Sequence, residues 1–327
     1  MGVFSAYAFA FGLAIMGQEG AVDPLPPAPI ELEDVLVDGQ RLDAISRNYV
    51  RRVGNSPPRG ALPARWAKPL CISVVNLKAP FAQQMIDGIA KTASDVGLDV
   101  RGPGCVSNIL IVGTDNGSQT ANYLVEGARD RFRSRVDRAN NDLNALRRFR
   151  ESDAAVRWWH ISFPRVRETG EFAGRGGGVR KPGQIANPES DGGGGSQIPF
   201  SFLGGASSLI APSVRYDTET VTVVVDFSKT ENVSMSALTD YVAMVVLAQI
   251  NPRADFSGQP SILSLFETPT AVGGLTDWDR DYLQAVYSGA IVRNTIASHE
   301  GAVSRRLASL QRVRQQGGAG PKEENER

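Results

Sequence analysis

The chain has 327 residues, of which 42% are hydrophobic, so it can bury one sizeable core or two modest ones. Its 35 lysine and arginine residues equal its 35 aspartate and glutamate residues, and only 7% of its residues are aromatic. Because there is no surplus of positive charge and no basic stretch interleaved with stacking residues, the composition argues against a nucleic-acid partner.

The N-terminal segment, residues 1–21, contains an apolar run at 3–16. This run is shorter than the ~20 residues of a membrane span and has the length of a signal-peptide core, although no lysine or arginine precedes it. We therefore expect export to the periplasm or the exterior, with residues 1–21 removed. The alternatives are a retained N-terminal anchor, which alone would imply membrane contact, and a buried helix of the fold.

Residues 22–63 are rich in proline, and we expect them to form a linker. Within it, residues 31–40 alternate acidic and apolar side chains and are predicted to be extended. They resemble the box with which outer-membrane receptors engage TonB, and an extended segment of this kind can add a strand to a partner's sheet. Asp34, Val35 and Val37 are the candidate partner-binding residues. A plain export linker is the alternative.

The globular domain is expected over residues 64–290 as an α+β fold, with a mixed sheet of four or more strands packed by helices. Runs of β-branched residues predict the strands, and apolar positions at helical spacing predict the helices. The order strand, helix, strand at its start is typical of a right-handed βαβ unit. The expected strands are 70–77, 108–113, 156–163 and 220–227, and the expected helices are 43–53, 80–96, 118–151, 236–250 and one that begins at 275–279.

Two further segments are expected to lie outside the packed domain. Residues 168–205 lack hydrophobic periodicity and contain glycine runs, so they are predicted to be a flexible insertion. The Gly174-x-Gly176 pair has neither the preceding strand nor the following helix of a dinucleotide loop. Residues 291–327 are predicted to be a basic helix followed by a disordered tail.

The two cysteines, Cys71 and Cys105, lie at the ends of two expected strands. In an oxidising compartment we expect them to form a disulfide, and two unpaired buried thiols are the alternative. The chain has no Cys-x-x-Cys motif, so a redox or zinc-ribbon role is not expected.

The end of the domain has the layout of the C-terminal half of a zinc metalloprotease. An apolar helix at 238–250 stops at Asn251 and Pro252, and a Ser-Ile-Leu segment and a helix with a capping-box start at 276–279 follow it. These residues resemble the end of a metzincin-type domain. The resemblance implies a metzincin-like topology.

The zinc site of that family does not carry over to this chain. The resemblance places Met244 and Ala248 at the two histidine positions of the zinc helix, Val245 at the glutamate, and Ala254 at the third ligand. Catalytic zinc needs three protein ligands and a carboxylate that activates water. We therefore expect no metal, no cofactor and no zinc-protease activity.

Residues 158–162 match the Trp-Trp-His-(Ile/Val)-Ser strand of an uncharacterised family of exported bacterial proteins, a resemblance that extends over about 31–287. Strand alternation places Trp158 and His160 on one face. Three roles remain open for His160: a structural histidine bonded to a backbone carbonyl or carboxylate, a ligand site with Trp158 as a stacking platform, or a hydrolytic relay with Ser162.

We therefore expect an exported, non-catalytic protein that serves as a binding or envelope-interaction scaffold. Its partner would be an envelope protein or a small ligand, neither of which the sequence identifies. One alternative is a hydrolase with a non-zinc site around His160. The other is a periplasmic partner of a TonB system that acts through residues 31–40.

Overall fold

The structure is a computed structural model that describes residues 32–54, 62–132, 143–167, 169–173, 200–201, 214–267, 272–289 and 295–317. The chain divides into two units between Gly39 and Gln40, and the fold described below belongs to the second unit.

The centre of this unit is a six-stranded mixed sheet of order β1-β2-β6-β3-β4-β5. The first three strands in this order run parallel, whereas β3 runs antiparallel to β6. The expected α+β fold with a mixed sheet of four or more strands is therefore confirmed. The strands are β1 (Ile72–Val75), β2 (Ile109–Thr114), β3 (Val156–Val166), β4 (Phe172–Ala173), β5 (Phe200–Ser201) and β6 (Val214–Asp226).

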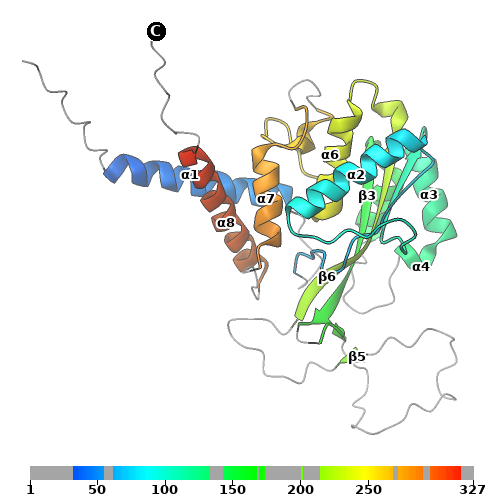
Figure 1. Ribbon diagram of the computed structural model, residues 1–327, viewed down its shortest axis with the longest axis horizontal. Coiled ribbons are helices and arrows are strands. Elements are labelled where there is room, and N and C mark those ends of the chain that lie inside the picture. The colour runs from blue at the N-terminus through cyan, green and yellow to red at the C-terminus, as the bar shows by residue number, and fades with distance from the viewer. Residues whose placement is uncertain are drawn as a thin grey trace, which may run out of the picture. The chain divides into compact units, whose positions relative to one another are not determined.

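Helices cover both faces of the sheet (Figure 1). One face packs against α2 and α6, and the other packs against α3, α4 and α5. The helices are α1 (Leu32–Val53), α2 (Ala79–Asp95), α3 (Gly117–Gly127), α4 (Arg129–Phe132), α5 (Leu143–Glu151), α6 (Met235–Leu247), α7 (Asp277–Tyr287) and α8 (Ile296–Gly317), with 3-10 turns η1 (Phe227–Lys229) and η2 (Ile262–Ser264).

Helix α6 is at the centre of the main core. Ser234 caps its N-terminus by accepting a hydrogen bond from Ala237 N, and its apolar residues leave no solvated face. Its neighbour α2 approaches closely at Gly88, where an added Cβ would lie 2.5 Å from the side chain of Thr239. The prediction that helices at 80–96 and 236–250 pack on the sheet is confirmed.

The packed domain is larger than residues 64–290. Tyr49 and Val53 of α1 and Val303 and Leu307 of α8 belong to the main core. The segment 291–327 was expected to lie outside the fold. Its helix α8 instead packs on α7 and contributes Val303 and Leu307 to the core. Frequent arginines and polar residues in both helices concealed the apolar stripe. Residues 318–327 lie outside the described part of the chain.

Two other expectations about helices were wrong. Helix α1 begins at Leu32, so the backbone of 32–40 is helical rather than extended. The single helix expected over 118–151 is divided into α3, α4 and α5, with a break at Ala128, whose φ of −133° is not helical. Residues 1–31, which include the expected signal peptide, and residues 133–142 lie outside the described part.

The strands β3 and β6 are longer than expected. Charged side chains near their ends made the full length of these strands difficult to predict from the sequence. Arg165 on β3 pairs with Glu219 on β6, and Arg215 pairs with Asp217 at 2.9 Å. These ion pairs occupy positions at which a sequence reading expects loop residues. Most of the glycine-rich insertion at 168–205 lies outside the described part, but β4 and β5 form within it.

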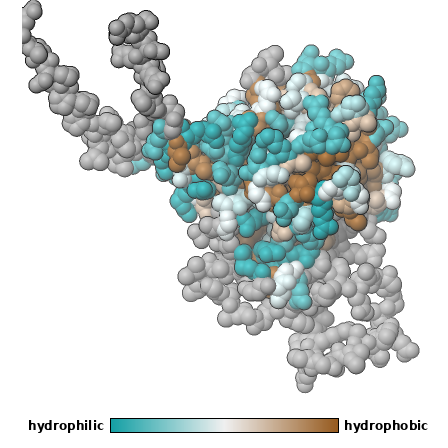
Figure 2. Space-filling view, in the orientation of Figure 1, coloured by the Kyte–Doolittle hydropathy of each residue, from teal (hydrophilic) through white to brown (hydrophobic). Residues whose placement is uncertain are grey.

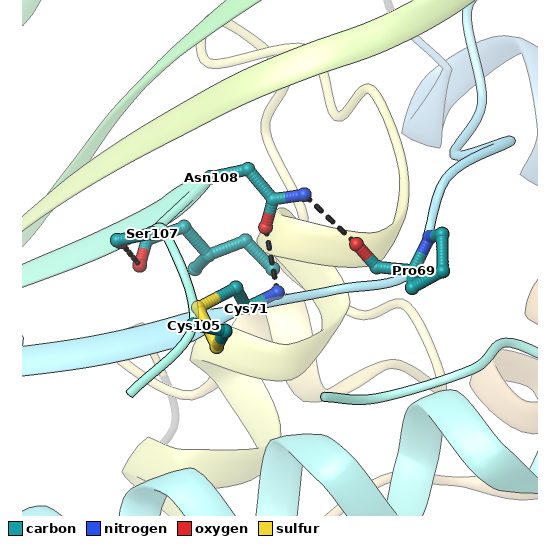
Figure 3. Close-up of a disulfide and its surroundings, with 6 residues drawn as sticks. Pro69, Cys71, Cys105, Ser107 and Asn108 are labelled. Carbon is teal, nitrogen blue, oxygen red and sulfur yellow. Dashed lines mark hydrogen bonds between the residues drawn. A yellow bond between two sulfur atoms is a disulfide. The ribbon is translucent and has the colours of Figure 1, made fainter. Parts of the chain in front are cut away.

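The disulfide between Cys71 and Cys105 is confirmed, with a Cα–Cα distance of 6.0 Å. Figure 3 shows how Asn108 holds the neighbouring backbone: Cys71 N donates to Asn108 Oδ1 at 2.7 Å, and Asn108 Nδ2 donates to Pro69 O at 3.0 Å. The disulfide thus joins the start of β1 to the approach to β2. A disulfide of this kind is typical of a protein outside the reducing cytoplasm.

None of the helices in the described residues is long and apolar enough to cross a membrane. Hydrophilic residues cover much of the face in Figure 2, and hydrophobic residues gather on the right of the view. The exposed large apolar side chains include Val75 at the end of β1 and Phe81 in α2.

Candidate functional site

The structure places Trp158 and His160 on the face of β3 that packs on α6. The indole of Trp158 contacts the ring of Tyr241 edge-to-face, and the imidazole of His160 reaches the backbone of Val245. Trp159, which lies between them, packs in the cluster on the opposite face. The alternation expected along this strand is therefore present.

His160 is buried, with 6% of its surface exposed. Its Nε2 lies 2.8 Å from the carbonyl oxygen of Val245. A carbonyl can only accept, so Nε2 carries the proton and donates it. Burial lowers the pKa of His160 to about 4, which the hydrogen bond to Val245 only partly offsets. This arrangement is the backbone-bonded structural histidine, one of the three roles that the sequence left open.

The three positions to which the metzincin resemblance assigns the zinc-binding motif lie on α6 and at its C-cap, and they are apolar and buried. Met244 and Val245 are 0% exposed and Ala248 is 2% exposed. Ala254, at the position of the third ligand, borders a pocket, and the neighbouring Asp255 is exposed. Within the described ranges, no group of three or more histidine, cysteine, aspartate or glutamate side chains is arranged to hold a metal ion.

A pocket of about 230 Å³ lies beside β3, between α5 and the segment that follows α6. One wall is a row of aromatic rings. Trp158 and Tyr241 have ring centroids 6.4 Å apart, and Tyr241 and Phe266 have centroids 5.0 Å apart, both edge-to-face. The remaining wall residues are mostly apolar, and they include Phe149, Ile250, Pro252, Ala254, Phe256 and Leu263.

The turn after α6 builds the far side of this pocket. Helix α6 ends at Leu247, before the expected stop at Asn251 and Pro252, because Ala248 is extended, with φ of −126° and ψ of 152°. Arg253 N donates to Asn251 Oδ1 at 3.0 Å, which stabilises the turn that follows. Trp158 Nε1 donates to Ile250 O at 3.4 Å, so the tryptophan fixes the position of this turn against β3. Further along this segment, the apolar side chain of Phe256 also lines the pocket.

The polar side chains that line the pocket are Arg148, Ser152, Arg157, His160, Tyr241, Gln249 and Glu267, and two of them lie next to the aromatic row. Burial, and then the negative charge of Glu267, raise the pKa of Tyr241 well above its ordinary value, so its hydroxyl keeps its proton. Glu267 also lines the pocket, and its Oε1 accepts a hydrogen bond from Phe256 N at 3.4 Å. The arrangement suits an apolar group that ends in a polar atom.

The backbone of β3 contributes to the same site. Asp226 N donates to Ala155 O at 2.8 Å, which makes Ala155 and Asp226 a hydrogen-bonded pair of the antiparallel ladder. Because bonded and non-bonded pairs alternate, the N–H and C=O of Trp158 point away from β6. On that side of β3 the neighbouring strand in the described residues is β4, which pairs only at Arg165.

The other candidate residues, Asp34, Val35 and Val37, lie in α1, and their side chains are outside the described part of the chain. The helical backbone removes the extended conformation on which the strand-addition hypothesis depended.

Sequence reasoning missed most of the pocket. It identified Trp158 and His160 from their strand, but not Tyr241, Phe266 or Glu267. The available signal was Tyr241, one of few polar side chains in an otherwise apolar helix.

Comparison of the chain with known protein families, with curated proteins and with solved structures found no match. A functional proposal therefore depends on the pocket beside β3 and on the apolar residues at Met244, Val245 and Ala248.

Proposed function

We propose that this protein is an exported, non-catalytic binding protein on a zinc-less metzincin-like scaffold, and that the pocket beside β3 is its ligand site. The observation that carries the proposal is the aromatic row of Trp158, Tyr241 and Phe266. It lines a pocket beside β3, where the described residues place no strand next to Trp158 on the side away from β6. Apolar pockets with a few convergent polar groups are typical binding sites.

Two observations favour binding over catalysis. Met244 on α6 and Ala248 at its C-cap, where the resemblance would place zinc ligands, are apolar and buried, so a metal there would have no ligands. The Nε2 of His160 is committed to Val245 and the pKa of its imidazole is about 4, so this ring is a weak base in the folded protein. These features support a scaffold and disfavour a hydrolase built around His160.

The size of the pocket favours a peptide side chain over a whole small molecule. A volume of about 230 Å³ is below the roughly 300–1,000 Å³ of typical small-molecule sites. An extended peptide would place one aromatic or large apolar side chain in the pocket and pair its backbone with the outward N–H and C=O of Trp158. The Tyr241 hydroxyl would then hydrogen-bond a polar atom of that side chain.

Selection from a peptide library on the oxidised full-length protein tests this proposal. Peptides with an aromatic anchor should be enriched and should bind in fluorescence titrations. Ala254→Trp should abolish this binding because Ala254 borders the pocket and the larger side chain fills it. Ala79→Trp, at an exposed position of α2, is the matched control and should bind normally. Peptides that bind both variants alike would place the site elsewhere.

Export is the part of the proposal that concerns compartment. The disulfide between Cys71 and Cys105 and the apolar run at 3–16 support a location in the periplasm or outside the cell. Mass spectrometry of the mature N-terminus tests this, because removal of residues 1–21 would leave a shortened chain. An intact chain in the cytoplasm would contradict export.

A further inference from the structure

Strand β1 lies at an edge of the sheet, because it is first in the strand order and β2 is its neighbour. In parallel pairing, alternate residues direct their backbone groups toward the neighbouring strand. Ile109 N donates to Cys71 O at 3.1 Å, so Cys71 and every second residue after it face β2. The N–H and C=O groups of Ile72 and Val74 therefore point away from the sheet.

These outward groups have no hydrogen-bond partner in the part of the chain that the structure describes. The segment 99–101 lies along the same edge but pairs with Leu70 instead. Leu70 N donates to Asp99 O and Arg101 N donates to Leu70 O, both at 2.8 Å. At the other end of the open stretch, Asn76 ends the strand with a φ of 57°.

The open edge lacks most of the features that prevent strands from pairing between molecules. Such edges are commonly protected by charged side chains, by proline or by a β-bulge. Residues 70–77 contain no charged residue and no proline, and β1 pairs with β2 without a shift in register. The edge is short, which limits the strength of pairing with another strand but leaves its backbone groups available.

Two copies of this edge are complementary when they run antiparallel about a two-fold axis at Ser73. Ile72 of one copy would then lie opposite Val74 of the other, as a pair of residues that exchange both N–H···O bonds. The axis repeats this pair, so every outward backbone group of Ile72 and Val74 in both copies would gain a partner. Because residues 70–77 are uncharged, no like charges within them would meet across the axis.

Exposed apolar side chains flank both ends of this edge. Val75 and Phe81, which are 44% and 46% exposed, lie at the C-terminal end of β1 and shortly after it. Val106 is 91% exposed and follows Cys105, which the disulfide holds against Cys71 at the N-terminal end of β1 (Figure 3). Antiparallel pairing brings opposite strand ends together, so Val75 and Phe81 of one copy would approach Val106 of the other. This match favours a second copy over an unrelated strand.

We propose that the edge of β1 is a dimerisation surface, on which a second copy of this chain pairs antiparallel through Ile72 and Val74. The two sheets form one continuous sheet across the two-fold axis, and neither copy keeps an open β1 edge. A few backbone hydrogen bonds and apolar contacts make a small interface, so the dimer is weak and depends on concentration. The dimer uses none of the residues that line the pocket beside β3, so it is independent of the proposed peptide site.

Sedimentation velocity of the oxidised full-length protein over a range of concentrations tests the proposal, and a reversible equilibrium between monomer and dimer is expected. Hydrogen exchange shows what covers the edge. The amides of Ile72 and Val74 should exchange rapidly in dilute protein and become protected as the dimer forms. A chain that remains monomeric at its highest soluble concentration would overturn the proposal. Protection that does not change with concentration would also overturn it, because another segment of the same chain would then cover the edge.

Variants locate the interface. Val74→Pro removes the outward N–H of Val74 and no hydrogen bond to β2, so it should weaken dimerisation by at least about tenfold. Ser73→Lys places like charges opposite each other across the axis and should have a similar effect, which keeps the test valid if Val74→Pro does not fold. Gln315→Lys, at an exposed position of α8, is the matched control and should dimerise like the parent. Parental dimerisation of the folded edge variants would overturn the assignment of the interface to β1.

Discussion

The imidazole of His160 on β3 donates a hydrogen bond through Nε2 to the backbone carbonyl of Val245 on α6, at 2.8 Å. This bond joins β3, which borders the pocket of about 230 Å³, to the helix that forms the centre of the core. We interpret the contact as structural, and it has a measurable dependence on pH.

The pKa of His160 is about 4 in the folded protein and about 6.5 in an unfolded chain. Between these values the unfolded state binds a proton that the folded state does not. The contribution of neutral His160 is therefore complete above about pH 6.5 and is lost as the pH falls toward 4, by up to about 1.4 kcal/mol per pH unit. Urea unfolding at several pH values measures this.

His160→Gln provides the comparison for that measurement. The difference in stability between the parent and His160→Gln should shrink as the pH falls from 6.5 to 4. His299→Gln is the comparison variant. The pKa of His299 is also lowered to about 4, so this variant should remove the acid sensitivity that His299 causes and keep the part that His160 causes. A difference that stays constant with pH would show that His160 is not a buried neutral group.

A second prediction concerns Asp279, which is fully buried and joins three parts of the chain. It accepts hydrogen bonds from Tyr49 Oη at 2.7 Å, from Ile262 N at 2.8 Å and from Thr276 N at 2.9 Å. Asp279→Asn would replace one acceptor oxygen by a donor that faces these donors. We expect a loss of roughly 2–4 kcal/mol in the free energy of unfolding.

Asp277→Asn is the control for Asp279→Asn, because Asp277 lies on the same helix with an exposed side chain. Chemical denaturation of both variants, followed by circular dichroism, separates the loss of the network from a general effect of charge near the start of α7. Equal stability of the two variants would mean that the bonds to Tyr49 and Ile262 contribute little.

A third prediction tests the burial of α6. Ala248→Asp should unfold the domain or cost about 3–5 kcal/mol, because it introduces an unpaired charge at a position that is 2% exposed. Ala79→Asp, at the exposed start of α2, should leave stability unchanged or slightly improved, because a negative charge is favourable there. A folded Ala248→Asp protein of parental stability would contradict the core position of this helix.

A fourth prediction concerns the disulfide, which closes a loop with a sequence separation of 34. Cys71→Ser should destabilise the protein by about 3–4 kcal/mol on the chain-entropy account and lower the melting temperature by several degrees. Calorimetry of the parent with and without a reductant is the control, and reduction should reproduce the effect of the substitution. Two reactive thiols in the native protein would contradict the bond itself.

The parallel part of the sheet could be predicted because the sequences of its strands have a clear local pattern. The β-branched runs of β1, β2 and β6 and the amphipathic spacing of α2 are local patterns, and local patterns decide these elements. The disulfide and the capping box at Thr276 and Asp279 were also predictable, because each depends on residue type and a short spacing.

The outer helices and the site could not be predicted in the same way. In α1 and α8, arginines and polar side chains surround the few residues that reach the core, such as Tyr49 and Leu307. The pocket requires Trp158, Tyr241 and Phe266 to meet from β3, α6 and the segment after η2. No local sequence pattern indicates that these three residues are in contact, because their proximity depends on tertiary packing.

The zinc content of the purified protein tests most directly whether α6 is a structural helix in a non-catalytic scaffold. The protein should be expressed in zinc-containing medium, purified without chelators and analysed by elemental mass spectrometry alongside a peptidase assay. We predict no stoichiometric zinc and no peptidase activity, because apolar residues occupy Met244 and Ala248, the positions to which the proposed metzincin resemblance assigns zinc ligands. One tightly held zinc ion per chain that is lost in a folded variant of Met244 or Ala248, such as Met244→Leu, would contradict the account.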